Sequence, residues 1–262
     1  MTAPSTRREH PKVKGAPDYD DPTYWDVKFA TGKDVGEWLN SGEILIETTL
    51  SELDHRPQSS AIPRALHLGP GISKLGVKLS EAFRQRNWPG SCIVNVDFSA
   101  EAVRIGRELE SGKDSDLAMH WLQIDLRSWS DVAQLTNYAP FDVVVDKSTS
   151  DAIATSPSVT LTPESDTSSI CPIISDILKG NVNLTLSPVE LLALHLVPLT
   201  QKGSTWVVLS YSNIRFDNLG YAGKYWTVVS RTSLKAPQGQ TSTFAHTPEV
   251  FHWAYVLRRN KS

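Results

Sequence analysis

A repeated order of short apolar runs, each followed by a polar group and a helical pattern, constrains the fold of this chain more than any other feature. The first run, Arg64–Leu68, leads into a Gly-Pro-Gly turn at 69–71. Three later runs end on carboxylates, at Asp97, Asp125 and Asp146. Strands that alternate with helices predict a parallel sheet with right-handed crossovers. The polar groups that end its strands then lie along one edge, where ligands bind in such sheets.

The glycine turn is the first candidate for a ligand site. Because neither Gly69 nor Gly71 carries a Cβ, the backbone of this turn can approach a ligand closely. A plain strand–helix connection would explain the turn equally well. The run Ser91–Asp97 strengthens the ligand interpretation, because it ends in a carboxylate about 25 residues after the glycines. In doubly wound sheets a carboxylate at this place accepts hydrogen bonds from ribose hydroxyls.

Composition narrows the class of protein. The 262 residues are enough for one α/β domain with a large core, and a net charge of −3 gives no reason to expect nucleic acid as a partner. Of the two cysteines, Cys92 lies in a predicted buried strand, so we expect a reducing, cytoplasmic location. No stretch approaches ~20 apolar residues and no signal core is evident, so we expect no membrane partner. No Cys/His spacing is typical of zinc, so we expect no metal site.

The chain divides into a tail, a cap, a sheet region and an insertion. Residues 1–17 are polar with three prolines and predict a disordered tail. Residues 18–262 predict a single domain, which begins with a helical cap over 18–60; a helix starts near Asp21 and a second runs over 34–53. Residues 148–187 are rich in Ser, Thr and Pro and follow a polar strand end. We expect a lid or substrate-binding insertion there, with a disordered surface loop as the alternative.

The remaining patterns predict a sheet of seven strands. We expect five strands over 64–68, 92–96, 120–124, 142–145 and 206–210. We expect three helices over 73–86, 100–110 and 188–199. The runs 225–230 and 250–257 have no clear crossover helix between them, so they predict an antiparallel pair at the sheet edge. The result is an α/β, Rossmann-like, doubly wound sheet with an antiparallel last strand. This layout resembles the class I methyltransferase fold.

Four segments resemble one family of S-adenosylmethionine-dependent methyltransferases, the enzymes that modify lysines of translation elongation factor 1-alpha. Tyr24–Phe29, with Trp38 downstream, resembles the family's Tyr-Trp-x-x-Arg-Tyr…Trp signature. Leu68–Ser73 is similar to its Leu-Gly-Cys-Gly-Asn-Ser, and Val96–Ser99 to its Val-Asp-Tyr-Ser. Phe141–Ala152 is similar to its Phe-Asp-Val-Val-Leu-(Asp/Glu)-Lys-Gly-Thr-Leu-Asp-Ala, which is the longest and most specific match. The resemblance is best over residues 24–151.

The resemblance implies S-adenosylmethionine as the cofactor and assigns one side of its site. Trp25 and Phe29 would form a wall of the cofactor pocket, and Gly69 and Gly71 would let the backbone meet the methionine half. Aromatic faces suit a sulfonium, because it is a cation. The family's acceptor would be a protein lysine, on elongation factor 1-alpha or a similar protein.

The resemblance assigns the nucleoside side to residues at the strand ends. Asp97 would hold the ribose hydroxyls and Phe98 would lie against the adenine. Asp125 and Leu126 would read the adenine edge, and Lys147 would lie beside the cofactor. An apolar slot with one polar edge suits adenine, and a carboxylate suits ribose.

The chain departs from the family pattern at several positions. Ile72 stands where the family has Asn after the glycine turn, and Lys28 and Phe29 stand where it has Arg and Tyr. Ser148 and Ser150 replace Gly and Leu in the longest motif. Replacing Arg by Lys removes a guanidinium fork. The acceptor would enter at the strand over 142–145 and the loop after it, where Ser148 and Ser150 stand, so the resemblance supports methyl transfer more than a lysine acceptor.

Methyl transfer needs a positioned acceptor more than acid–base chemistry. A lysine must lose a proton first, so a carboxylate can orient the amine; Asp146 is the candidate catalytic residue, with a cofactor or helix-capping carboxylate as the alternative. Two other functions stay open, a small-molecule methyltransferase of the same fold and a non-catalytic binding protein. A dinucleotide oxidoreductase is disfavoured, because Lys74 stands where its third glycine is expected.

Overall fold

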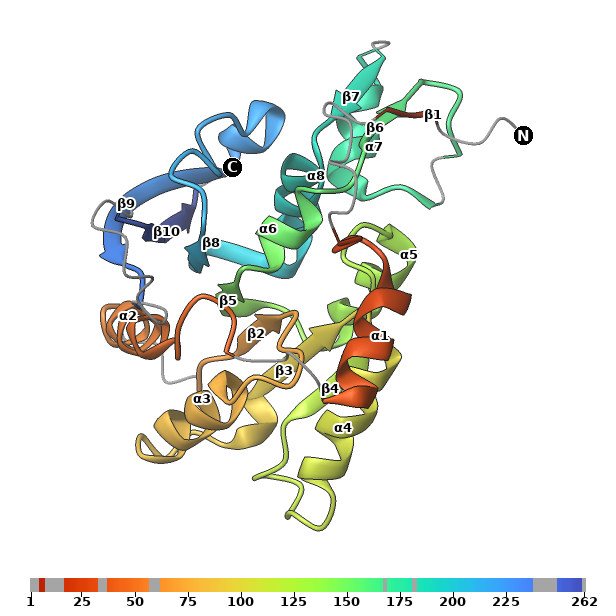
Figure 1. The fold of residues 1–262 in the computed structure, drawn as a ribbon. Coiled ribbons are helices and arrows are strands. Elements are labelled where there is room, and N and C mark those ends of the chain that lie inside the picture. The colour runs from red at the N-terminus through yellow and green to blue at the C-terminus, as the bar shows by residue number, and fades with distance from the viewer. Residues whose placement is uncertain are drawn as a thin grey trace.

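A seven-stranded mixed sheet forms the centre of the computed structural model (Figure 1), which describes residues 5–7, 17–32, 37–56, 62–166, 169–180, 183–237 and 249–260. In spatial order the strands are β4 (His120–Gln123), β3 (Ile93–Asp97), β2 (Ala65–Leu68), β5 (Phe141–Lys147), β8 (Thr200–Ser210), β10 (Phe251–Arg259) and β9 (Trp226–Lys235). The first five run parallel, and β10 is antiparallel to both of its neighbours. The predicted fold class is therefore confirmed.

The predicted antiparallel pair at the sheet edge is confirmed. β10 lies between β8 and β9, so β9 is the outer strand of the pair. Burial explains the order, because β10 is largely buried along its second half whereas β9 is exposed along most of its length. The strand with the longer apolar run thus takes the inner position.

Helices cover both faces of the sheet (Figure 1), which explains why its central strands are apolar throughout. On β5, Val143 and Val145 face α2 (Glu43–Asp54) and α3 (Leu75–Arg84), whereas Val144 faces α8 (Pro188–Leu196). The helix α4 (Ala100–Glu110) packs beside β4, and α5 (Trp129–Val132) is short. The helices predicted over 73–86, 100–110 and 188–199 correspond to α3, α4 and α8.

The cap begins with α1 (Pro22–Thr31), which starts where predicted and ends at Gly32 in a left-handed conformation with φ 61°. The second cap helix is shorter than the prediction over 34–53. Residues 37–42 are not helical, and α2 begins only after Gly42, whose φ of 77° does not fit a right-handed helix. The non-helical segment lies over the carboxyl ends of the parallel strands and supplies residues of the site described below.

The insertion contains regular elements in its described part. It forms α6 (Thr149–Ile153), β6 (Ser158–Leu161), α7 (Pro172–Leu178) and β7 (Leu184–Leu186). β6 pairs antiparallel with β7 and with β1 (Ser5–Arg7) in a second, three-stranded sheet. The rest of the tail predicted over 1–17, apart from residue 17, lies outside the described residues. The domain boundaries stay a prediction.

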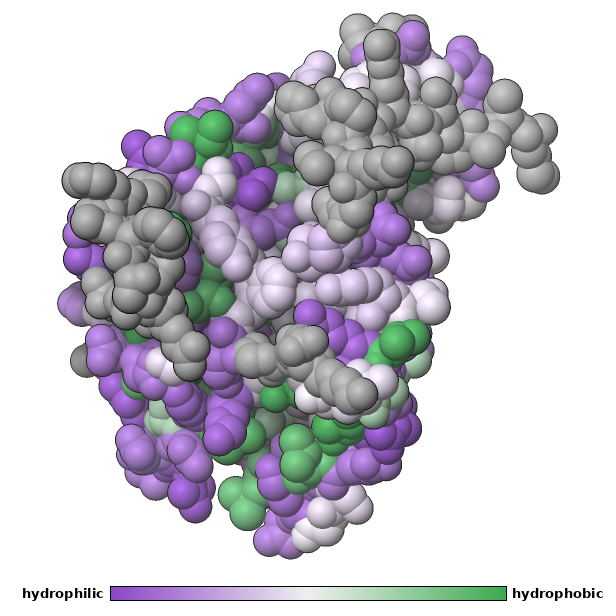
Figure 2. All heavy atoms as spheres, viewed as in Figure 1, coloured by the Kyte–Doolittle hydropathy of each residue, from purple (hydrophilic) through white to green (hydrophobic). Residues whose placement is uncertain are grey.

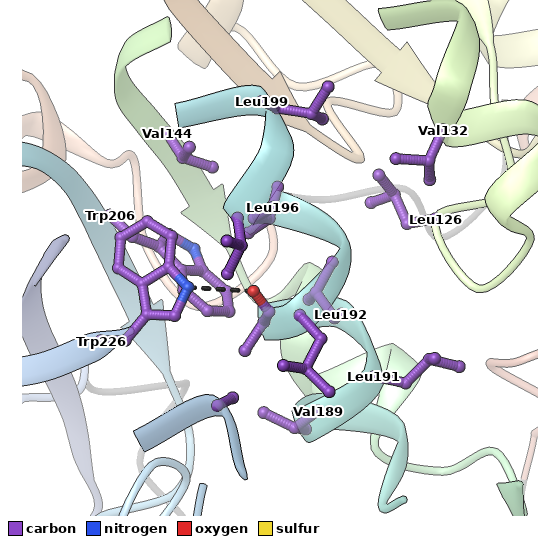
Figure 3. Packing of buried hydrophobic residues seen from close by; sticks show 14 of the residues in the cluster. Leu126, Val132, Val144, Val189, Leu191, Leu192, Leu196, Leu199, Trp206 and Trp226 are labelled. Carbon is purple, nitrogen blue, oxygen red and sulfur yellow. Dashed lines mark hydrogen bonds between the residues drawn. The ribbon is translucent and has the colours of Figure 1, made fainter. Parts of the chain in front are cut away.

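The largest apolar cluster surrounds α8, all of whose residues are buried. Figure 3 shows Trp206 and Trp226 beside this helix, and the Trp226 indole Nε1 donates a hydrogen bond to the Ala193 carbonyl (2.9 Å). The two tryptophan rings meet edge to face with centroids 5.8 Å apart. No helix among the described residues has the length and apolarity needed to cross a membrane.

This packing predicts the effect of a cavity in the α8 core. Leu192→Ala should lower the free energy of unfolding by about 2–5 kcal/mol, because the buried side chain is removed and its surroundings relax only in part. Urea unfolding followed by circular dichroism measures the change. The control Leu109→Ala, on an exposed face of α4, should shift it by less than about 0.5 kcal/mol. Equal effects of the two variants would contradict the assignment of this core.

Candidate cofactor and acceptor site

A cavity of about 480 Å³ lies at the carboxyl edge of the sheet, under the cap. Its volume is in the range of small-molecule sites, and its place is the one that parallel sheets use for ligands. It is lined by all nine residues predicted for the cofactor: Trp25, Phe29, Gly69, Gly71, Asp97, Phe98, Asp125, Leu126 and Lys147. The structure thus brings these residues together, while the role of each stays a prediction.

The glycine turn is shaped so that only glycine fits. Gly69 and Gly71 both have a φ of 52°, a left-handed conformation that other residues adopt at a cost. A Cβ on Gly69 would lie 2.3 Å from the Thr149 hydroxyl oxygen, and one on Gly71 would lie 2.9 Å from the Phe29 ring. The turn therefore presents bare backbone to the cavity, with the Phe29 ring packed directly against it.

Asp97 ends β3 and ties it to the glycine turn. Its Oδ2 accepts a hydrogen bond from the Gly71 N–H, and its Oδ1 accepts one from the Ser99 N–H, both at 2.9 Å. Burial raises the pKa of Asp97 to about 6, although these backbone hydrogen bonds oppose the shift. At neutral pH the group is thus mostly ionised, and its carboxylate oxygens retain lone pairs for further donors.

Asp125 is held by a residue that the sequence analysis missed. Both of its carboxylate oxygens accept hydrogen bonds from the Arg127 guanidinium, at 2.9 and 2.8 Å. Burial alone would raise the pKa of Asp125, but the Arg127 contacts outweigh it and the pKa lies below its usual range. Arg127 also lies over the Phe98 ring (5.7 Å) and donates to the Asp20 carbonyl (2.8 Å). It therefore ties the start of the cap to the end of β4.

Lys147 makes a second tie between cap and sheet. Its ammonium pairs with the Glu37 carboxylate (2.5 Å) and donates to the Ser73 hydroxyl (3.0 Å). Burial raises the pKa of Glu37, but the hydrogen bonds from Lys147, the Lys74 N–H and Ser73 outweigh it, so the pKa is lowered overall. No sequence signal marked Glu37, because it lies in a segment predicted as helix and pairs with a residue 110 positions away.

Four aromatic side chains form another wall of the cavity: Tyr19, Trp25, Trp38 and Tyr211. The Trp25 and Trp38 rings meet edge to face, with centroids 5.8 Å apart, and the Trp38 and Tyr211 rings do so at 6.3 Å. In Figure 2 side chains of intermediate hydropathy, the class of Trp and Tyr, gather near the middle of the face shown. Tyr211 directly follows β8, so the strand-end rule applied to the run 206–210 would have found it.

Ser148 joins this aromatic wall to the segment that directly follows β5. It adopts a φ of 65°, unusual for a residue other than glycine. Its hydroxyl accepts a hydrogen bond from the Trp38 indole N–H (3.1 Å) and donates one to Asp151 (2.8 Å). Asp151 in turn pairs with Arg215 (2.7 Å). Asp151 and Arg215 both line the cavity, so an ion pair stands beside the aromatic wall.

Asp146, the predicted catalytic carboxylate, is not among the residues that line the cavity. It is fully buried, and its Oδ1 accepts hydrogen bonds from the Thr149 and Ser150 N–H groups (2.8 and 3.2 Å) at the start of α6. Burial raises its pKa to about 7. This geometry is that of the helix-capping alternative, and a catalytic role for Asp146 stays a prediction.

Comparisons with known proteins agree with the fold. No family model matches the chain. It is 27% identical over 242 residues, 92% of this chain and 84% of the other, to "Methyltransferase srdJ" of Neurospora crassa. A solved S-adenosylmethionine-dependent methyltransferase of Anabaena variabilis superposes with a TM-score of 0.55 at 10% identity, covering 98% of this chain and 99% of the other. The N-methyltransferase NodS of Bradyrhizobium japonicum, in complex with S-adenosyl-L-homocysteine, gives 0.50 at 14% identity, covering 94% and 100%.

The fold, the cavity at the strand ends and the similarity to srdJ define a class of protein. The chain is an S-adenosylmethionine-dependent methyltransferase of the class I fold. The relatives do not share one acceptor, so the lysine specificity expected from the sequence motifs is taken up below as a proposal.

The burial of Asp146 predicts a pH-dependent stability. Its folded-state pKa of about 7 lies above the unfolded value of about 3.9, so the folded chain binds the extra proton and wild-type stability falls as pH rises from 4 to 7. Asp146→Asn removes this titration. The variant should therefore gain about 4 kcal/mol of unfolding free energy relative to wild type between pH 4 and pH 8, measured by urea unfolding.

Asp116→Asn, at an exposed carboxylate, is the control and should change unfolding by less than about 0.5 kcal/mol at either pH. If the unfolding free energy of Asp146→Asn minus that of wild type stays constant with pH, the raised pKa of the buried Asp146 carboxyl would be refuted. The same Asp146→Asn protein also tests the catalytic prediction, because an orienting carboxylate cannot be replaced by an amide without loss of methyl transfer.

Proposed function

We propose that the protein transfers the methyl group of S-adenosylmethionine to a lysine amine of another protein. The observation that carries the proposal is the aromatic wall of Tyr19, Trp25, Trp38 and Tyr211, in the same cavity as the nine residues predicted for the cofactor. Aromatic faces stabilise an alkylammonium group and leave its lone pair unhindered once it is deprotonated. The motif resemblance to lysine methyltransferases supports the same acceptor.

The fit of the cofactor rests on this chain's own groups. The glycine turn at 69–71 would receive the methionine half, Asp97 the ribose hydroxyls, and Phe98 with Asp125 and Leu126 the adenine. The left-handed glycines and the ionised Asp97 support this assignment, because they offer open backbone and acceptor lone pairs where such a ligand needs them. When bound, the cofactor supplies a methyl group activated by a positively charged sulfur.

The protein's contribution is to position the acceptor and exclude water. The Glu37–Lys147 pair and the contact of Arg127 with the Asp20 carbonyl hold the cap over the cavity. Asp151 is the carboxylate beside the aromatic wall, and both its oxygens already accept hydrogen bonds, from groups that include Ser148 and Arg215. It fixes the wall, and the acceptor, bound as an ammonium group, gives up its proton to solvent before methyl transfer.

A small-molecule acceptor is the second candidate. The observation that favours it is the size of the cavity, about 480 Å³, together with the Glu37–Lys147 and Arg127–Asp20 contacts that hold the cap over it. Incubation of the protein with labelled S-adenosylmethionine and a cell lysate separates the two. We expect label on a protein band, and lysine analysis of that band should recover methyl-lysine. Label confined to small molecules would instead support the second candidate, and no label would support a non-catalytic binding protein.

The assignment of Asp97 predicts a loss of cofactor affinity. Asp97→Ala should weaken S-adenosylmethionine binding by about 10- to 100-fold in calorimetry, because a charged hydrogen-bond acceptor is removed. Wild-type affinity should also fall below pH 6, where the carboxyl gains a proton. Glu108→Ala, on the outer face of α4, is the control and should bind as wild type does. Unchanged affinity of Asp97→Ala would refute the ribose assignment.

A further inference from the structure

Lys28 places its ammonium group among three aromatic rings. The Nζ lies 5.6 Å from the Tyr24 ring centroid, 6.0 Å from that of Trp25 and 5.9 Å from that of Trp38. It also donates a weak hydrogen bond to the Tyr24 hydroxyl (3.4 Å). Trp25 stands nearly perpendicular to both other rings, at 82° to Tyr24 and 72° to Trp38. We call these three residues the cage.

The cage opens onto the cavity, because Lys28, Trp25 and Trp38 all line it. It also lies close to the cofactor turn. The Phe29 ring lies 5.5 Å from the Trp25 ring of the cage, and it packs against Gly71 so closely that a Cβ there would lie 2.9 Å from it. A cation in the cage is therefore near the predicted methionine end of the cavity and not at a remote surface.

Lys28 is stabilised differently from three other cations of the cavity. Arg127, Lys147 and Arg215 each pair with a carboxylate. Within the described residues Lys28 makes no such pair, and its contacts are ring faces and one hydroxyl. No residue of α1 is buried, so the Lys28 side chain could extend into water. It lies in the cage instead. The cage thus stabilises an alkylammonium group by cation–π attraction without a counter-ion.

We propose that the cage is a binding subsite for the ammonium group of the acceptor, and that Lys28 fills it until the acceptor arrives. This rests on the proposed function only for the identity of the ligand as an amine. The similar family motif has arginine where this chain has Lys28. The side-chain amine of Lys28 resembles that of a lysine acceptor, and this likeness is a feature of this chain. An acceptor must displace Lys28, which makes Lys28 an internal competitor.

Binding of choline to the protein alone tests the subsite. Lys28→Met removes the competing cation and keeps an apolar stem, so it should bind choline about tenfold more tightly than wild type, followed by tryptophan fluorescence. The neutral isostere 3,3-dimethylbutanol should show no such gain. Lys28→Arg keeps a cation in the cage and should behave as wild type. Equal gains for choline and its neutral isostere, or no gain in Lys28→Met, would overturn the proposal.

Variants of the cage wall locate the site. In the Lys28→Met background, Trp38→Ala should abolish the gain, whereas Trp38→Phe keeps a ring and should retain most of it. Lys74→Met is the matched control, because Lys74 also lines the cavity but contacts no cage ring in the described structure. A similar gain in Lys74→Met would show that loss of any positive charge suffices, and the cage would then carry no special role. Thermal unfolding confirms that each variant is folded.

Two cations could use these rings, the acceptor ammonium and the cofactor sulfonium. Calorimetry of the Lys28→Met protein separates them. If the cage serves the acceptor, choline and S-adenosylmethionine bind together, and Trp38→Ala leaves the affinity ratio of S-adenosylmethionine to neutral S-adenosylhomocysteine unchanged. Competition between choline and S-adenosylmethionine would overturn the acceptor assignment. A protein that binds choline as predicted but no S-adenosylmethionine would defeat the proposed function and leave the ammonium cage standing.

Discussion

The hydrogen bond from the Gly71 N–H to the buried Asp97 carboxylate is the contact on which the site depends. It joins the turn after β2 to the end of β3, two elements whose strands are already paired in register, Leu68 beside Val96. Without it the left-handed glycine turn would lose its partner and Asp97 would be a buried carboxylate with fewer donors. The glycine turn and the Asp97 carboxylate, which is proposed to bind the ribose hydroxyls, are therefore one structural unit.

The first helix of the cap, α1, is held by polar contacts more than by apolar burial. α1 buries none of its residues, yet Asp26 accepts hydrogen bonds from the Ser99 hydroxyl (2.6 Å) and the Glu101 N–H (3.1 Å) at the start of α4. A carboxylate at a helix N-terminus is favoured by the free N–H groups there. A cover fixed by such contacts can open at modest cost, which suits an enzyme that must admit and release its ligands.

Ser148 shows how the acceptor side is coupled to this cap. Its left-handed backbone costs on the order of 1–2 kcal/mol relative to glycine, the residue of the similar family motif. Two hydrogen bonds of its hydroxyl, to Trp38 and Asp151, offset that cost and fix the aromatic wall to the segment that directly follows β5. A departure from the family pattern thus adds a connection that glycine could not make.

The sequence by itself determined the alternation of strands and helices, and with it the cavity residues at the strand ends, because the carboxyl ends of parallel strands meet at one edge. Trp25 and Phe29 of the cap were predicted only from the motif resemblance. It also placed Asp146 at a strand end, but only burial decided that its carboxyl caps α6 beneath the surface. The partners of Lys147 and Ser148, Glu37 and Trp38, were decided by the tertiary structure. These contacts join residues 110 positions apart, and no local periodicity or turn pattern encodes which side chains meet when a cap folds over a sheet.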